Sequence, residues 1–204
     1  MNENDRILVT GFEPFGGESL NPSAYILEKI HQDNKLSMQC DTLLLPVDFE
    51  EAHRPVLERL KANQYKAWVG FGQAGGRSRI CLERVALNWV ETKQADNRGL
   101  VPTSGPLVHG ASAALFSTAP LEKIKSVLEV AGLPAEISHS AGAYVCNSLY
   151  FHVLNNLATE SWGLFIHVPY MTEQIQNKGE AVPSWDSSDL WQATSLVLTT
   201  VLHA

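Results

Sequence analysis

Short apolar runs alternate along the chain with stretches in which apolar residues recur every three or four positions. The runs are too short for typical helices and predict strands at 6–10, 39–45, 66–72, 80–89, 135–138 and 162–168. The periodic stretches predict helices at 22–31, 49–63, 121–131, 146–158 and 188–203. Such alternation is typical of α/β proteins. We therefore expect a three-layer α/β/α sandwich with a mainly parallel, twisted central sheet.

Proline and turn residues refine the ends of these elements. Asn21 before Pro22 predicts a helix that is capped by the asparagine and has proline at its first position. Pro55 indicates that the second helix kinks or begins late. Residues 89–112 are rich in turn formers and predict a long connection that could wall an active site.

Composition points to one compact unit. The chain has 204 residues, 45% of them hydrophobic, and no linker-like tract divides it, so we expect a single domain over 1–204. A net charge of −7 with dispersed lysines and arginines argues against nucleic acid or an anionic membrane as a partner.

Two further features bear on the compartment. The start, MNENDR, lacks the basic and apolar regions of a signal peptide, and no apolar run approaches the ~20 residues of a membrane span. Three cysteines, Cys40, Cys81 and Cys146, show no disulfide-scaffold spacing, which favours reduced thiols. We therefore expect a cytoplasmic protein.

Cys146 is the leading candidate for chemistry. In AGAYVCNSLYFHVL an apolar, strand-like stretch is expected to turn into a helix at the cysteine itself. Unpaired N–H groups and the helix dipole at such a place stabilise a thiolate, so we expect an activated nucleophile with a lowered pKa. The alternative is a buried cysteine that serves as a small hydrophobic residue.

Two residues could complete a catalytic group with this thiol. His167 lies near the end of the short apolar run GLFIHVPY, where the carboxyl edge of an α/β sheet collects catalytic groups. Glu83 stands within the strand-like RICLERVALNWVE and could orient the imidazole. The alternatives are a core histidine with satisfied nitrogens and a solvated strand charge beside Arg84.

Other motifs are too weak to predict a cofactor. GFEPFGG follows a strand but lacks the GxGxxG spacing and the Lys-Ser/Thr ending of a phosphate loop. The seven histidines and three cysteines show neither H-x-x-x-H nor Cys-x-x-Cys spacing. We therefore expect no bound metal and no cofactor.

Five ordered blocks carry a resemblance that spans nearly the whole chain. They are VTGFEPFGGESLNPS (9–23), VGFGQAGGRSRICLERVALN (69–88), DN (96–97), SAGAYVCNSLYFHVL (140–154) and FIHVPY (165–170). The chain resembles the pyroglutamyl peptidases I, or pyrrolidone-carboxylate peptidases, cysteine peptidases that remove N-terminal pyroglutamate from peptides. The resemblance implies Cys146 as nucleophile, His167 as base and Glu83 as orienting acid. It also implies a homo-oligomer, either a dimer or a tetramer.

The same resemblance implies a substrate pocket. Phe12, Phe15, Tyr144 and Val145 match the family's apolar lining, which suits a compact uncharged lactam. Gln73 matches a glutamine that is similar to a hydrogen-bond partner for the lactam amide. Without the resemblance, the two phenylalanines read as core aromatics and Gln73 as a polar residue at a strand end.

One departure from the family pattern leaves a second function open. Where many relatives read roughly ARIPDN this chain reads TKQADN, with Lys93 in place of an arginine and Gln94 and Ala95 in place of isoleucine and proline. Lysine lacks the planar donor fork of arginine. The alternative is therefore a non-catalytic pyroglutamyl-binding or scaffold homologue with impaired turnover. A nucleoside phosphorylase-like transferase would need a phosphate site that the sequence does not contain.

Overall fold

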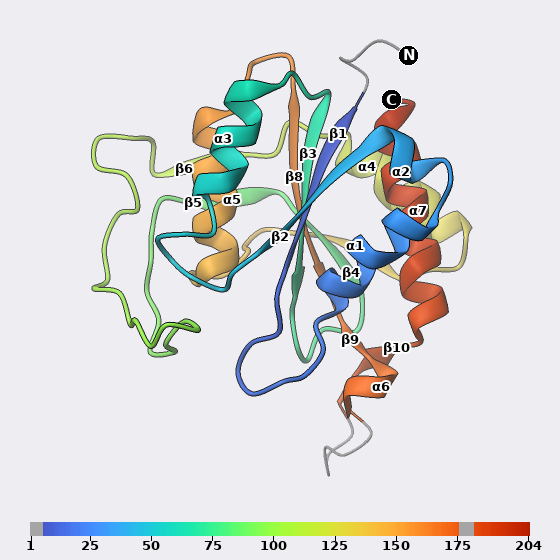
Figure 1. The fold of residues 1–204 in the computed structure, drawn as a ribbon, viewed down its shortest axis with the longest axis horizontal. Helices are drawn as coiled ribbons and strands as arrows, with labels where there is room; N and C mark the ends of the chain where they lie inside the picture. The colour runs from blue at the N-terminus through green and yellow to red at the C-terminus, as the bar shows by residue number, and fades with distance from the viewer. Residues whose placement is uncertain (1–5, 176–181) are drawn as a thin grey trace.

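A computed structural model describes residues 6–175 and 182–204, and a six-stranded sheet forms its centre (Figure 1). The strands are β1 (Ile7–Phe12), β2 (Cys40–Leu45), β3 (Ala67–Gln73), β4 (Ile80–Glu83), β7 (Ala135–Ser138) and β8 (Trp162–Val168). Their spatial order is β2-β1-β3-β8-β4-β7. Strands β2, β1, β3 and β8 run parallel, whereas β4 runs antiparallel to β8. The mainly parallel sheet is as predicted.

Helices cover both faces of this sheet, which confirms the α/β/α prediction (Figure 1). The first face carries α1 (Pro22–Gln32), α2 (Leu36–Gln39), α4 (Leu121–Val130) and α7 (Ser187–Leu202). The second face carries α3 (Arg54–Ala62) and α5 (Val145–Asn156). Each face has its own buried cluster, because successive strand residues point to opposite sides: Val9 and Val69 pack under the first group, Leu8 and Trp68 under the second.

Smaller elements lie at the margins of the sheet. Strands β5 (Val85–Leu87) and β6 (Ala114–Phe116) form an antiparallel pair. Strands β9 (Tyr170–Met171) and β10 (Ser184–Trp185) form a parallel pair next to α6 (Thr172–Ile175), beyond the end of β8. Strand β5 falls within the strand predicted at 80–89, whereas β6, β9, β10, α2 and α6 were not expected from the apolar pattern.

The helix starts follow their capping chemistry. Asn21 accepts a hydrogen bond from the Ser23 N–H at 3.0 Å and Pro22 opens α1, as the sequence predicts. The predicted helix at 49–63 begins later, at Arg54. Asp48 explains the delay, because its Oδ1 accepts the N–H groups of Glu50 at 2.7 Å and Glu51 at 2.8 Å and fixes them in a turn.

The strand predicted at 80–89 is wrong as one element, since it divides at Arg84. The Arg84 N–H still donates to Ser138 at 2.8 Å, but its carbonyl accepts from Ser117 at 2.9 Å, and the chain leaves the sheet. Asn147 on α5 then holds β5: it accepts from the Leu87 N–H at 2.8 Å and donates to the Leu87 carbonyl at 2.9 Å. The break ends β4 at Glu83.

The connection predicted at 89–112 is present and is fastened at the DN pair. Asp96 accepts the Phe49 N–H at 3.2 Å, and Asn97 donates to Glu13 at 2.8 Å. The loop is thus tied to the segments that follow β1 and β2.

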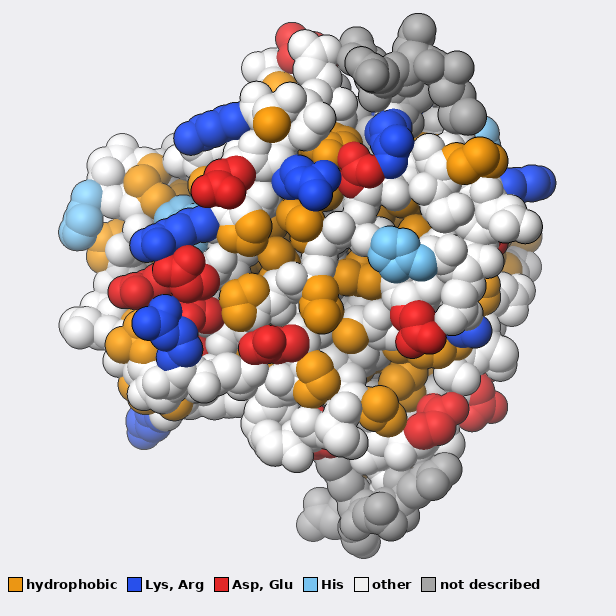
Figure 2. Space-filling view, in the orientation of Figure 1, with side chains coloured by type: hydrophobic (Ala, Val, Ile, Leu, Met, Phe, Trp, Pro, Cys, Tyr) orange, Lys and Arg blue, Asp and Glu red, His pale blue; other side chains and the backbone are white. Residues whose placement is uncertain are grey.

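Charges of both signs are intermixed on the face shown in Figure 2, with no broad basic patch. Among the described residues no helix is long and apolar enough to cross a bilayer. Residues 1–5 of the polar start MNENDR lie outside the described part of the chain.

Candidate active site

Strand pairing gathers the candidate residues on the second face of the sheet. Residues opposite each other in a β-ladder point to the same side, so the pair Glu83 and Phe165 shares a face with the pair Cys81 and His167. Phe165 packs in the cluster beneath α5. Glu83 and His167 therefore both face the helix that begins at Val145.

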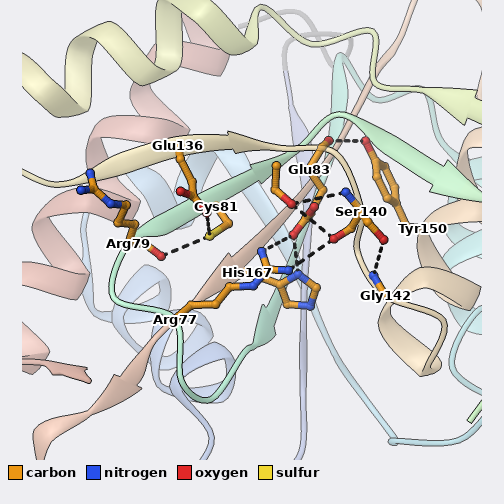
Figure 3. Close-up of polar contacts among 10 residues, drawn as sticks. Arg77, Arg79, Cys81, Glu83, Glu136, Ser140, Gly142, Tyr150 and His167 are labelled. Atoms are coloured by element: carbon orange, nitrogen blue, oxygen red, sulfur yellow. Dashed lines mark hydrogen bonds and ion pairs between the residues drawn. The ribbon is translucent and has the colours of Figure 1, made fainter. Parts of the chain in front are cut away.

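Glu83 and His167 are joined by a short hydrogen bond (Figure 3). Nδ1 of His167 lies 2.7 Å from Oε1 of Glu83, and the two residues are 0% and 5% exposed. Because a carboxylate can only accept, Nδ1 carries the proton. Nε2 then has its lone pair free, and no described residue forms a hydrogen bond with it. This is the arrangement of a base that is oriented by an acid.

Cys146 is the second residue of α5, and its sulfur lies against β3. A Cβ built on Gly72 would lie 3.0 Å from Cys146 Sγ and 2.8 Å from Phe165, so only glycine leaves room for the thiol. Gly72 is paired with His167 in the β3–β8 register. The structure thus brings the cysteine to the strand residue beside the histidine. The sequence reasoning did not single out Gly72, although glycines alternating in WVGFGQ are a usable signal.

The charge state of the thiol differs from the expectation. Burial, followed by the charge of Glu83, raises the pKa of Cys146 to about 12, and the positive charge of Arg77 opposes this only in part. Desolvation of the half-buried thiol thus outweighs the helix N-terminus, and the prediction of a lowered pKa is wrong. A thiolate would have to form together with an imidazolium beside it.

Arg77 is a member of this group that the sequence reasoning missed. Its Nη1 donates to Glu83 Oε1 at 2.7 Å, the same oxygen that receives the His167 proton, and its Nη2 donates to the Ser140 carbonyl at 3.3 Å (Figure 3). A cation six residues before a carboxylate in a buried strand could have signalled it.

The apolar pocket candidates lie in one cluster with the cysteine. Phe12 at the end of β1 is 2% exposed, Phe15 is half-buried, and Val145 is buried. Tyr144 is the N-cap residue that precedes α5. Its ring packs edge-on against Phe49, with ring centroids 5.1 Å apart, and burial raises its pKa to about 12. These side chains pack on the α5 face, as a pocket beside Cys146 requires.

Gln73 is placed differently. It follows Gly72 and pairs with Val168, whose side chain packs under α1 and α7, so strand alternation turns its side chain to the first face. There its Oε1 accepts from Gln174 Nε2 at 2.8 Å. The structure does not bring its carboxamide into the apolar group.

The loop that departs from the family pattern approaches the site through its backbone. Tyr144 Oη donates to the Ala95 carbonyl at 2.8 Å. Lys93 and Gln94 are exposed, and the Lys93 side chain has no hydrogen bond or ion pair with the described residues. The polar Gln94 therefore does not intrude into the apolar cluster.

A separate cavity of about 630 Å³ lies at the end of the sheet where β3 and β8 begin, and none of these residues lines it. Two of its polar side chains are already paired: Lys66 donates to the Leu202 carbonyl at 2.7 Å and Ser161 to the Tyr65 carbonyl at 2.6 Å. We regard it as a surface cleft and not as the reaction site.

Comparison with known proteins gives the family. A family model described as pyroglutamyl peptidase matches residues 5–202. The chain belongs to the pyroglutamyl peptidase family. It is 36% identical over 202 residues to pyrrolidone-carboxylate peptidase 1 of Caldanaerobacter subterraneus, with 98% of each chain covered. It is 40% identical over 185 residues to the pyrrolidone-carboxylate peptidase of Pyrococcus furiosus, with 88% of this chain and 89% of the relative covered.

Solved structures of this pyroglutamyl peptidase family share the fold. The pyrrolidone carboxyl peptidase of Fervidobacterium islandicum aligns with a TM-score of 0.91 at 32% identity, covering 97% of this chain and 98% of the other. Pyroglutamyl peptidase I of Bacillus amyloliquefaciens aligns with a TM-score of 0.89 at 31% identity, covering 98% and 97%. The predictions of the family, of an α/β fold and of a hydrolase of the cysteine-peptidase class are confirmed.

Proposed function

We propose that this chain is an omega peptidase that hydrolyses the bond after an N-terminal pyroglutamyl residue, with Cys146 as nucleophile, His167 as base and acid, and Glu83 as orienting acid. The observation that carries the proposal is the 2.7 Å contact between Glu83 and His167 on the strand beside Gly72, against which the Cys146 sulfur packs. Two members of the group come from adjacent strands and one from a helix start, which fixes their geometry.

The proton sequence follows from the free lone pair of His167. Nε2 takes the proton of Cys146 as the sulfur attacks the pyroglutamyl carbonyl, so thiolate and imidazolium form as a pair and the isolated thiol need not ionise. The N–H of Cys146 lies in the first turn of α5 and is a suitable donor to the oxyanion. His167 then protonates the departing amine, and a thioester remains. Water attacks this thioester, with His167 again as base.

The apolar residues give the site its proposed selectivity. Pyroglutamate is compact and uncharged, and we propose that Phe12, Phe15, Tyr144 and Val145 enclose its ring. Gln73 remains the proposed polar partner of the lactam. Its location supports this role less well, because the Gln73 side chain lies on the other face and already receives a hydrogen bond from Gln174.

The direct experiment is release of a chromophore from pyroglutamyl p-nitroanilide. The wild type should release it, and Cys146→Ser should lose nearly all of this activity. Cys40→Ser is the matched control, since Cys40 is a buried thiol on β2 whose pKa burial raises to about 12, as at Cys146, but which lies in the opposite cluster. Turnover that survives in Cys146→Ser would refute the proposed nucleophile.

The alternative is a non-catalytic homologue that binds pyroglutamyl peptides. The departures at Lys93, Gln94 and Ala95 motivate it, although the contact of the Ala95 carbonyl with Tyr144 supports an intact wall. Calorimetric binding of a pyroglutamyl peptide without any turnover would favour the alternative. In that case Lys93→Arg combined with Gln94→Ile should restore turnover if the loop is the cause.

Three expectations stay predictions: one catalytic domain over 1–204, a homo-oligomer of two or four chains, and a cytoplasmic location. Several large apolar side chains are exposed and could be covered in an oligomer; among them are Leu44 at 59%, Phe116 at 65% and Val130 at 87%.

A further inference from the structure

We propose that Arg77 is a positioning residue of this site: its contact with Glu83 keeps the carboxylate ionised and thereby decides which nitrogen of His167 carries the proton. The inference rests on the proposed function, because it concerns how the proposed base is prepared. It adds to the three proposed catalytic residues a fourth member, which touches neither the nucleophile nor the reacting carbonyl.

The geometry leaves Glu83 dependent on this arginine (Figure 3). The carboxylate is fully buried, and its Oε1 accepts both from His167 Nδ1 and from Arg77 Nη1, each at 2.7 Å. Its other oxygen, Oε2, is buried without any hydrogen-bond partner in the described structure. A buried carboxylate is costly unless a cation or several donors compensate it. Arg77 is the cation that performs this task, because neutral His167 supplies only a dipole.

The charge of Glu83 controls the tautomer of His167. An ionised carboxylate can only accept, so the imidazole proton must stay on Nδ1 and Nε2 can receive the thiol proton. A protonated Glu83 could donate to Nδ1 instead. The proton of the neutral ring would then move to Nε2, and the ring could no longer take a proton from Cys146. Arg77 excludes this second arrangement by favouring the carboxylate over the carboxylic acid.

The same guanidinium also reaches the segment that leads to the nucleophile. Nη2 of Arg77 donates to the carbonyl of Ser140 at 3.3 Å, in the connection between β7 and the start of α5 at Val145. Arg77 therefore links the end of β4 to the approach of the Cys146 helix. Its positive charge also opposes the rise in the Cys146 pKa that burial and Glu83 cause.

Arg79 is a matched control in the same loop. It is exposed, and its guanidinium has no hydrogen bond or ion pair with the described residues; only its backbone carbonyl is engaged, at 3.5 Å from Cys81 Sγ. Replacing either arginine by methionine removes one positive charge from the loop. The two substitutions differ in the contact with Glu83.

The test compares kcat/KM against pH for the wild type, Arg77→Met, Arg77→Lys and Arg79→Met with pyroglutamyl p-nitroanilide. Without the Arg77 guanidinium the buried Glu83 carboxylate loses its charged partner, so the acid limb of the Arg77→Met profile should move up by about one pH unit or more. Activity near pH 6 should fall by about tenfold or more and recover towards the wild-type value in alkaline buffer. Arg77→Lys should shift less in the same direction, and Arg79→Met should match the wild type.

A second readout keeps the proposal testable if stability suffers. Added guanidinium ion at non-denaturing concentration should move the acid limb of Arg77→Met back towards the wild type, because the Arg77 side chain is 30% exposed and its site can be reached from solvent. If Arg77→Met does not fold, Arg77→Gln takes its place, and a wild-type acid limb in that uncharged variant contradicts the proposal. An Arg77→Met profile that is unshifted, whether at full height or lowered equally at every pH, also overturns it. Absence of turnover in the wild type would instead refute the proposed function.

Discussion

Glu83 and His167 stand 84 positions apart in the chain, yet Oε1 of the first lies 2.7 Å from Nδ1 of the second. Antiparallel pairing of β4 with β8 produces this contact, because Glu83 lies opposite Phe165, two residues before the histidine on the same face. The contact fixes the proton on Nδ1 and leaves the lone pair of Nε2 available to accept a proton.

The first prediction concerns how strongly kcat depends on each residue of this pair. His167→Ala should lower kcat by about 10²–10⁴-fold, because it removes the proton carrier. Glu83→Gln should lower kcat less, though still by roughly tenfold or more, since it disturbs only the orientation of the ring. Glu122→Gln is the control, because it breaks an exposed ion pair with Arg84 and should change little. A Glu83→Gln enzyme with wild-type kcat would return Glu83 to a purely structural role.

The second prediction concerns the reactivity of the thiol. Burial, followed by Glu83, raises the pKa of Cys146 to about 12, so a Cys146 that had no base beside it would stay protonated at pH 7. Wild-type alkylation by iodoacetamide should nevertheless be appreciable near neutral pH, because His167 takes the proton. In His167→Ala the rate should rise about tenfold per pH unit through the alkaline range. Equal pH profiles for both proteins would show that the histidine does not activate the sulfur.

Gly72 supplies the third prediction. Gly72→Ala places a methyl group 2.8 Å from Phe165 and 3.0 Å from Cys146 Sγ, which should destabilise the fold by about 1–3 kcal/mol and displace the thiol. Gly105→Ala is the control, since its new methyl group meets nothing within 4 Å. Urea unfolding and kcat/KM would measure both effects. The packing argument fails if Gly72→Ala keeps wild-type stability and activity.

The fourth prediction decides the role of Gln73. If its amide serves the lactam, Gln73→Leu should lower kcat/KM for a pyroglutamyl substrate by about 5–150-fold, equivalent to roughly 1–3 kcal/mol, and should leave the poor cleavage of a prolyl substrate unchanged. Gln174→Leu is the comparison, because it removes the residue that donates to Gln73. An unchanged ratio of the two substrates in Gln73→Leu would assign Gln73 to the contact with Gln174 alone.

A stacked histidine pair between α3 and α5 gives the fifth prediction. The rings of His53 and His152 lie 4.0 Å apart, and burial, with His53 beside it, lowers the pKa of His152 to about 4 from the ordinary 6.5. Between pH 6.5 and about 4, His152 therefore binds a proton in the unfolded chain but not in the folded chain. Stability should be fully present above pH 6.5 and should fall as the pH drops towards 4.

Urea midpoints at pH 7 and pH 5 test this sign. His152→Gln should reduce the loss of stability between these two values, whereas His203→Gln, at an exposed position after α7, should keep the wild-type difference. A His152→Gln protein that is as pH-sensitive as the wild type would assign the effect to other groups.

The apolar pattern was sufficient for the sheet and the main helices, because burial imposes a period on the sequence that can be counted. The apolar run of β8 has the predicted limits, 162–168, and α7 (Ser187–Leu202) lies within one residue of the helix predicted at 188–203. The strand at 80–89 was misjudged at Arg84, because a continuous apolar pattern does not reveal where a chain leaves one sheet for another ladder.

Three features of the site depend on three-dimensional conformation and could not be counted in this way. The spacing of Arg77 and Glu83 makes their contact possible, but the conformation of the loop between β3 and β4 decides whether it forms. The pKa of Cys146 rises because tertiary packing desolvates the half-buried thiol and places Glu83 near it, whereas a local motif shows only the helix start. The side chain of Gln73 turns away because strand alternation is set by the register with β8.

The central claim is that Cys146 forms a thioester with the pyroglutamyl group. Rapid acid quench during turnover of a pyroglutamyl ester, followed by mass spectrometry of the peptide that contains Cys146, measures this directly. The account predicts that this peptide gains the mass of one pyroglutamyl acyl group, that the adduct disappears as substrate is exhausted, and that Cys146→Ala shows none. Turnover without an adduct, or with an adduct on Cys40 or Cys81, would contradict it.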